Sequence, residues 1–142
     1  GAQVIPKDSV ILTSRASVGY VALAGKDLCT NQGFQSLIPK QSVLSKFLMF
    51  WIQQNRPEFE SRSAGSTFKE ISKSNVKSIK LELPPLAEQK RIVEIVNTID
   101  EFISQTELTS SKAQKLRSGL LSDLLSGEHE IPVSYDKVIG AA

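Results

Sequence analysis

The chain has few of the residues on which most catalytic and metal sites depend. Its 142 residues include one cysteine, Cys29, and one histidine, His129. A single cysteine excludes an internal disulfide framework, and neither residue has a partner at metal-ligand spacing. Cys29 also lacks an activating neighbour, so we interpret it as a small buried side chain. We predict no catalytic residue, no metal, no cofactor and no enzymatic activity for this chain by itself.

Long apolar runs are also absent. No run approaches the roughly 18 residues needed to span a bilayer, and the first residues lack the charged and apolar segments of a signal peptide. Together with the single cysteine, this pattern predicts a cytoplasmic protein. The first residue is glycine and a strand is expected almost at once, which indicates a fragment or a processed chain.

Charge is divided unevenly along the chain, whose net charge is +2. Residues 1–83 carry eleven Lys and Arg against six Asp and Glu, a balance of +5. Residues 84–142 carry six against nine, a balance of −3. A basic first part favours a polyanionic partner, although a solvated surface with a small charge excess explains the same numbers equally well.

Residues 1–83 have the pattern of a small α+β domain. Four short runs rich in β-formers, separated by turn residues, predict an antiparallel or mixed sheet. These runs are residues 10–14, 18–23, 28–30 and 34–38. An apolar face at helical spacing follows over residues 43–52, with Ser42 as the predicted N-cap and Trp51 in the core. We expect one or two short helices in this domain, and a last strand over residues 78–83, where polar and apolar residues alternate.

Residues 84–127 predict a single long helix. The tandem prolines Pro84 and Pro85 end the domain, and Pro85 fits a first helical turn, where a missing N–H costs nothing. Glu88 lies near the positive end of the helix dipole. Gly127 is the predicted stop of the helix.

Apolar residues of this helix recur at the spacing of a coiled-coil seam. The predicted helix-pairing residues are Ile92, Val96, Ile99, Ile103, Ala113, Leu116, Leu120 and Leu124. Since amphipathic helices of this length depend on a packed partner, we expect the helix to pair. Residues 128–142 are predicted to form a partly disordered tail.

Without a catalytic site, recognition is the kind of function that remains. Arg and Lys bind phosphates or guanine edges, Asn and Gln pair with adenine, and Ser and Thr contact phosphates. Such residues gather in three predicted loops, although ordinary turn chemistry also accounts for most of them. The candidate DNA-contacting residues are Ser14, Arg15, Ser17, Asn31, Gln32, Arg62, Ser66, Thr67 and Lys69.

Four segments in order resemble the specificity subunits of type I restriction-modification systems. Residues 10–19 are similar to the family's strand, Ser-Arg-x-x-x-Gly and strand element, and residues 30–34 to its Asn-Gln element. Residues 65–67, together with the helix start at 83–92, resemble the exit from a target recognition domain. Residues 116–127 resemble the end of its helix. The resemblance spans most of residues 4–127.

The resemblance implies a non-catalytic subunit that reads DNA. Residues 1–83 would be the later part of one target recognition domain, without the segment expected before it. Residues 84–127 would be a spacer helix that pairs as an antiparallel coiled coil and sets the distance between two half-sites. The implied partners are double-stranded DNA, modification (methyltransferase) and restriction subunits, and a second copy of this chain, which would form a homodimer through the helices.

A second hypothesis is a protein–protein scaffold that oligomerises through the long helix. Salt distinguishes the two, because binding to a polyanion weakens steeply as salt rises and binding through an apolar interface does not. An enzyme that uses Cys29 is a third and weaker hypothesis.

Overall fold

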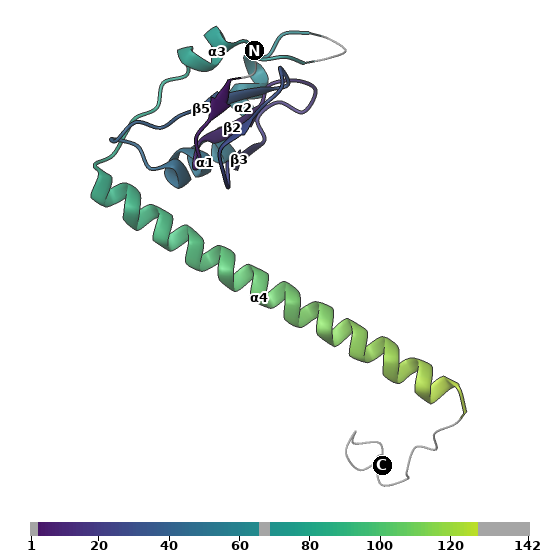
Figure 1. Ribbon diagram of the computed structural model, residues 1–142. Helices are drawn as coiled ribbons and strands as arrows, with labels where there is room; N and C mark the ends of the chain where they lie inside the picture. Colours follow the sequence, from purple (N-terminus) through teal and green to yellow (C-terminus); the bar gives the residue numbers. More distant parts are fainter. Residues whose placement is uncertain (1–2, 66–68, 128–142) are drawn as a thin grey trace. The chain divides into compact units, whose positions relative to one another are not determined.

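The computed structural model describes residues 3–65 and 69–127. The chain forms two compact units, residues 1–96 and residues 97–142. Among the described residues, strands come first and helices follow (Figure 1). The elements are β1 (Val4–Ile5), β2 (Val10–Thr13), β3 (Val21–Leu23), β4 (Leu28–Cys29), β5 (Phe34–Leu37), α1 (Ser45–Gln54), α2 (Arg56–Ser61), α3 (Lys73–Ser78) and α4 (Leu86–Leu125).

Strand β2 is the centre of the larger sheet. Its run of β-branched and apolar residues favours extended backbone. β3 and β5 pair with it on either side, both antiparallel, in the order β3–β2–β5 (Figure 1). β1 and β4 form a separate two-stranded antiparallel sheet. The α+β class is confirmed, and the described strands all pair in the antiparallel sense.

The core is formed by the larger sheet and the helices that pack on it. Helix α1 contacts β2 and β3, as its predicted apolar face requires. Trp51 is half-buried and packs edge-on against Phe59 of α2, with ring centroids 6.2 Å apart. The buried core residues are Val10, Leu12, Val18, Leu48, Ile52, Phe59 and Ile71.

The predicted N-cap of α1 is wrong. The helix begins at Ser45, and its N-cap residue is Leu44. The N-cap side chain makes no capping hydrogen bond. The Leu44 N–H donates instead to the side chain of Gln89. Ser42 contributes only its carbonyl oxygen to the same side chain.

The predicted strand over residues 78–83 is also wrong. Ser72 Oγ accepts a hydrogen bond from Asn75 N at 3.1 Å and starts the short helix α3, which ends at Ser78. The irregular segment that follows packs Ile79 and Leu81 against the core. The alternation therefore reflects contact with the core and not a strand ladder. Together with α1 and α2, α3 gives three short helices in the described residues, where one or two were predicted.

Cys29 is exposed, so its interpretation as a buried side chain is wrong. Side chains alternate between the two faces of a strand, and in β4 Leu28 takes the more buried face. The two-stranded sheet of β1 and β4 offers one face to the domain, and Cys29 lies on the other.

Gln89 joins the first turn of α4 to the loop before α1. Its side chain is fully buried. Its Oε1 accepts from Leu44 N at 2.9 Å, and its Nε2 donates to the carbonyl oxygens of Ser42 at 3.0 Å and Pro84 at 2.9 Å. Pro85 stands just before the helix, where its carbonyl oxygen accepts from the N–H groups of Glu88 and Gln89. One amide side chain thus satisfies three main-chain groups that no secondary structure pairs.

Helix α4 is continuous over 40 residues, or about 60 Å at 1.5 Å per residue. It ends before Gly127, whose φ of +75° is the left-handed conformation of a helix stop. Both predicted features are confirmed. The residues of α4 from 98 onward are exposed. The predicted tail of residues 128–142 lies outside the described residues, and the division of roles at residue 84 stays a prediction.

Candidate nucleic-acid interface

The end of strand β2 brings three predicted loops together. Ser14 N donates to Gly33 O at 2.8 Å, and Ile71 N donates to Ser14 O at 2.9 Å. One residue further on, Ala16 N donates to Lys69 O at 2.9 Å. Segments around residues 15, 32 and 69, which are far apart in the sequence, therefore meet at one end of the larger sheet.

Arg15 and Glu70 lie opposite each other in this cluster, as an isolated antiparallel bridge. Arg15 Nε donates to Glu70 Oε1 at 2.9 Å. Both side chains are about half exposed, 48% and 51%. In water such a pair contributes roughly 0–1 kcal/mol to stability, so it is available for another role. Lys69 is exposed beside it, and together with Ala16 these residues line a shallow pocket.

A hydrogen-bonded turn at Asn31 fixes the conformation of the second loop. Asn31 Oδ1 accepts from Gly33 N at 2.8 Å, a local turn that Asn favours. Its main-chain oxygen accepts from Phe34 N at 3.2 Å. Gln32 is exposed at the tip of this turn. The side-chain oxygen of Asn31 is therefore occupied by the turn, whereas Gln32 presents its amide to solvent.

Arg62 forms several hydrogen bonds with other residues of the domain. Its Nε and Nη2 donate to Glu58 Oε1 at 3.1 and 2.7 Å, and its Nη1 donates to Ser78 Oγ at 3.0 Å. Its carbonyl oxygen accepts from Asn75 Nδ2 at 2.7 Å. The guanidinium thus links α2 to the end of α3, and contact with DNA would cost it these bonds.

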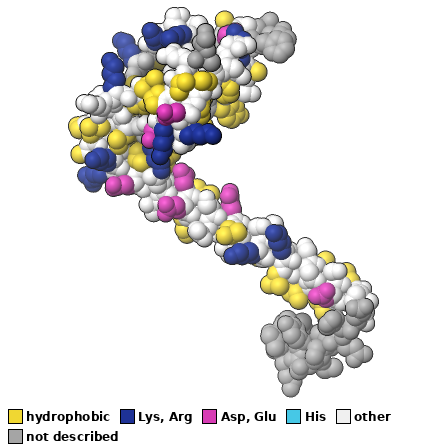
Figure 2. All heavy atoms as spheres, in the orientation of Figure 1, with side chains coloured by type: hydrophobic (Ala, Val, Ile, Leu, Met, Phe, Trp, Pro, Cys, Tyr) yellow, Lys and Arg dark blue, Asp and Glu magenta, His cyan; other side chains and the backbone are white. Residues whose placement is uncertain are grey.

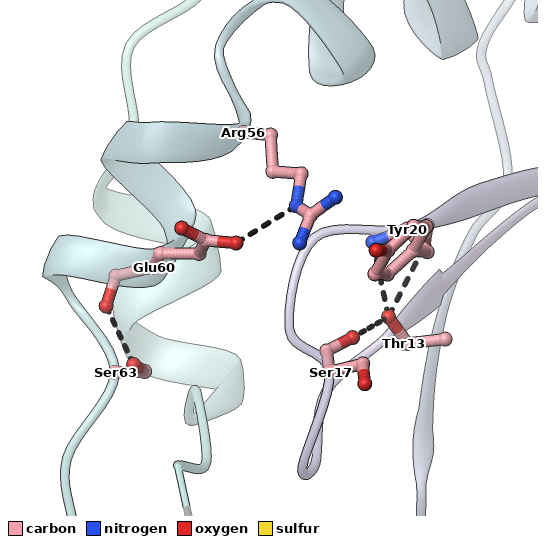
Figure 3. A network of polar contacts seen from close by, with 6 residues as sticks. All are labelled: Thr13, Ser17, Tyr20, Arg56, Glu60 and Ser63. Carbon is pink, nitrogen blue, oxygen red and sulfur yellow. Dashed lines mark hydrogen bonds and ion pairs between the residues drawn. The ribbon is translucent and has the colours of Figure 1, made fainter.

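The other residues predicted to contact DNA differ in their exposure. Ser14 is fully buried, and no partner of its Oγ is found among the described residues. A buried side chain cannot reach a groove, so its predicted contact with DNA does not fit this position. Ser17 is exposed, and its carbonyl oxygen accepts from Thr13 Oγ1 (Figure 3). Ser66 and Thr67 lie outside the described residues.

Arg56 is one of the residues that the sequence did not indicate. Its guanidinium carbon lies 3.8 Å from the centroid of the Tyr20 ring, and its Nε donates to Glu60 Oε1 at 2.8 Å. Figure 3 shows the guanidinium between these two side chains. The interaction with Tyr20 is the main cause that raises the pKa of Arg56, and Glu60 adds to it. Local sequence patterns could not indicate this contact, because the Tyr20 ring lies far from Arg56 in the sequence.

The same arginine explains the glycine of the Ser-Arg-x-x-x-Gly segment. Gly19 has a φ of +93°, which only glycine adopts without strain. A Cβ on Gly19 would lie 2.7 Å from Arg56 Cγ, closer than such atoms approach. The turn that carries Arg15 and Ser17 therefore requires glycine for both backbone conformation and space.

The face of the domain that Figure 2 shows carries Lys and Arg side chains at several places. Within residues 3–65 and 69–127, no group of His, Cys, Asp and Glu side chains could hold a metal ion. Over the same residues, no helix is both long and apolar enough to cross a bilayer.

The first two predicted helix-pairing residues of α4, Ile92 and Val96, lie in the unit formed by residues 1–96. Ile92 and Val96 are half-buried and, with Phe47, Phe50 and Trp51, line an apolar groove beside α1. Both therefore have partners within residues 1–96.

The later pairing positions are open to solvent. Ile99, Ile103, Leu116, Leu120 and Leu124 are all exposed large apolar side chains. The last three lie with Ala113 along a shallow apolar groove of the helix itself, and Figure 2 shows apolar side chains along α4. Seen by itself, this part of the helix exposes apolar area that a partner would bury.

Fold and sequence both match a known family. Residues 1–117 match the type I restriction modification DNA specificity domain. The chain belongs to this family. It is 34% identical to the MjaIX type I restriction enzyme specificity subunit of Methanocaldococcus jannaschii over 80% of its own length, and 30% identical over 89% to the putative MjaX specificity subunit of the same organism.

Solved structures agree with the match. A chain from a structure of type I R-M system assembly and conformational transition aligns with 89% of this chain at a TM-score of 0.76 and 25% identity, and this chain covers 32% of it. The HsdS subunit from Thermoanaerobacter tengcongensis aligns with 91% at a TM-score of 0.68 and 24% identity, with 32% of that chain covered. This chain spans 27% of the MjaIX subunit and 30% of the MjaX subunit.

Proposed function

We propose that this chain is a non-catalytic DNA-reading part of a type I restriction-modification complex, and that it reads one half of a bipartite target. The observation that carries the proposal is the family match over residues 1–117, which includes the domain and most of α4. The match favours DNA reading over the scaffold hypothesis, because the matched family is described as a DNA specificity domain.

The loop cluster at the end of β2 supplies the reading surface. Arg15, Ser17, Gln32 and Lys69 are exposed there on segments that main-chain hydrogen bonds hold. Arg and Gln can pair with base edges, and Lys and Ser contact phosphates. Phosphate contacts would fix the register of the domain on the duplex, and base contacts would select the sequence. Recognition of this kind requires no catalytic group.

Helix α4 carries the assembly functions in this proposal. Its exposed apolar positions pair with α4 of a second copy as an antiparallel coiled coil, and the length of the pair sets the distance between the half-sites. Methyltransferase subunits dock on the paired helices, and these together recruit the restriction subunit. The likeness to a chain from a structure that concerns assembly of the type I R-M system supports a role within a multi-subunit complex.

DNA binding by the chain should depend steeply on salt. We expect the affinity for a duplex to fall linearly on a log–log plot, and Lys69→Ala to reduce that slope by about 0.9 if Lys69 neutralises one phosphate. Fluorescence anisotropy with a labelled duplex at several salt concentrations measures both. Lys90→Ala, which removes an exposed lysine from α4, is the charge-matched control and should leave the slope unchanged. An affinity that is insensitive to salt would support the scaffold hypothesis instead.

The chain should be a dimer through α4. We expect light scattering after size exclusion to give twice the chain mass of 15.6 kDa at high concentration. Leu116→Asp with Leu120→Asp should give the monomer mass, because each aspartate would bring a charge into the apolar seam. The exposed Glu107→Asp with Lys112→Asp keeps the seam and should remain dimeric. A monomer at every concentration of the unaltered chain would contradict the pairing.

A further inference from the structure

We propose that Glu70 is a positioning residue that presents Arg15 to the major-groove edge of a guanine. The inference rests on the proposed DNA-reading function and assigns one base contact within it. Glu70 was not among the residues that the sequence pointed to, because it lies 55 positions from Arg15.

The main chain brings the two side chains together. Ala16 N donates to Lys69 O, and Ile71 N donates to Ser14 O, so these two bonds flank the bridge of Arg15 with Glu70. In an antiparallel ladder this arrangement is the non-hydrogen-bonded pair, whose Cα atoms are closest, about 4.5 Å apart. Cross-strand side chains at such a pair lie side by side. The contact between the carboxylate and the guanidinium is therefore built into the backbone.

The same ladder directs both side chains outward. Ser14 and Ile71, which precede Arg15 and follow Glu70, are fully buried, whereas Arg15 and Glu70 are about half exposed. Glu70 is fixed from its other side as well, since its N–H and C=O exchange hydrogen bonds of 2.9 Å with Ala64. Main-chain hydrogen bonds therefore hold the backbone of the pair, and both side chains face solvent.

The bond to Glu70 leaves the recognising end of the arginine available. The bond uses Nε of Arg15. Within the described residues, Glu70 is the partner found for this guanidinium. Both terminal nitrogens can then donate, one to O6 and one to N7 of a guanine, which is the commonest specific contact of arginine with DNA. Arg62 offers the contrast, because Glu58 and Ser78 take donors from all three of its nitrogens.

Charge favours a base over a phosphate as the target of Arg15. The ion pair is neutral overall, and the carboxylate repels a phosphate that approaches the guanidinium. A guanine edge carries no net charge, so the pair can meet it without that repulsion. The second carboxylate oxygen of Glu70 remains an acceptor, suited to the N4 amino group of a cytosine beside the contacted base. Lys69, which has no such partner among the described residues, suits the phosphate.

The experiment measures base preference position by position. The full chain is incubated with a pool of DNA duplexes that carry randomised positions, and the bound duplexes are sequenced. We expect Glu70→Gln to reduce the preference for guanine at one position roughly ten-fold, within the range of bidentate contacts. Arg15→Ala should remove the preference at the same position, and the double variant should be no worse than Arg15→Ala, as for residues that act through one contact. Glu70→Gln should not reduce the salt dependence of binding, because Arg15 contacts a base and not a phosphate in this proposal.

Glu82→Gln, which removes an exposed carboxylate elsewhere in the domain, is the control and should keep every preference. The inference is overturned if Glu70→Gln retains all base preferences, or if it weakens binding equally on every sequence. Thermal unfolding of each variant identifies a general loss of structure, and Glu70→Asp then tests whether a shorter carboxylate restores part of the preference. A wild-type chain that selects no sequence at any salt concentration would instead overturn the proposed function itself.

Discussion

Replacing Gln89 by alanine should lower the free energy of unfolding by about 2–4 kcal/mol. The substitution removes three hydrogen bonds and leaves the N–H of Leu44 and the carbonyl oxygens of Ser42 and Pro84 without the partner that satisfies them. Each buried polar group left unpaired costs about 1–3 kcal/mol, and the cavity adds to the loss. Urea unfolding followed by circular dichroism measures the difference. Gln54→Ala, at an exposed position of α1, is the matched control and should change stability by less than about 0.5 kcal/mol.

A second variant separates the hydrogen bonds of Gln89 from its shape. Gln89→Glu keeps the size of the side chain but removes the donors to Ser42 and Pro84. Burial would raise the pKa of the new carboxyl above its unfolded value, so the folded state would bind more protons and stability should fall as pH rises. We expect this variant to be most stable at low pH and to lose stability through neutral pH. A loss that does not change with pH would show that the side chain is not held in its buried position.

Lengthening α4 should move the half-sites apart without changing either of them. Seven residues inserted near Thr106–Ser110 add one heptad, which keeps the apolar seam in register. At 1.5 Å per residue the helix becomes about 10.5 Å longer, which corresponds to about three base pairs at 3.4 Å each. Selection from duplexes whose half-sites are separated by different spacers should therefore recover a spacer about three base pairs longer.

The control for this insertion is a replacement of seven exposed residues in the same region by a different helical heptad of equal length. It should retain the original spacer, since the length of the helix is unchanged. Recovery of the original spacing by the lengthened chain would contradict the spacer function of α4. Loss of both half-site preferences would indicate damage to the domain rather than a change in spacing.

The sequence predicted the elements whose signals are local. β2 is a compact run of strand formers, and the helical spacing after Pro85 and the stop at Gly127 define α4 almost to the residue. The pattern over residues 78–83 misled because alternation reports which side chains touch the core. An irregular segment packed on a core produces the same alternation as a strand.

Contacts between residues far apart in the sequence could not be predicted from local sequence patterns. Gln89 lies 45 residues from Leu44, and Glu70 lies 55 from Arg15. The sequence predicted Arg15 and Lys69 as loop residues that contact DNA, and the structure brings their loops together. It could not show that Ser14 faces the interior or that Arg62 is bonded to Glu58 and Ser78, because both facts depend on the tertiary fold.

The anchoring of the loop cluster has a consequence for how such a surface can change over time. The bonds from Ser14 to Gly33 and Ile71, and from Ala16 to Lys69, join main-chain atoms. Most residue types can form them, so exposed side chains on these loops can be exchanged while the platform persists. New target sequences can then arise through a few substitutions, with the fold inherited intact.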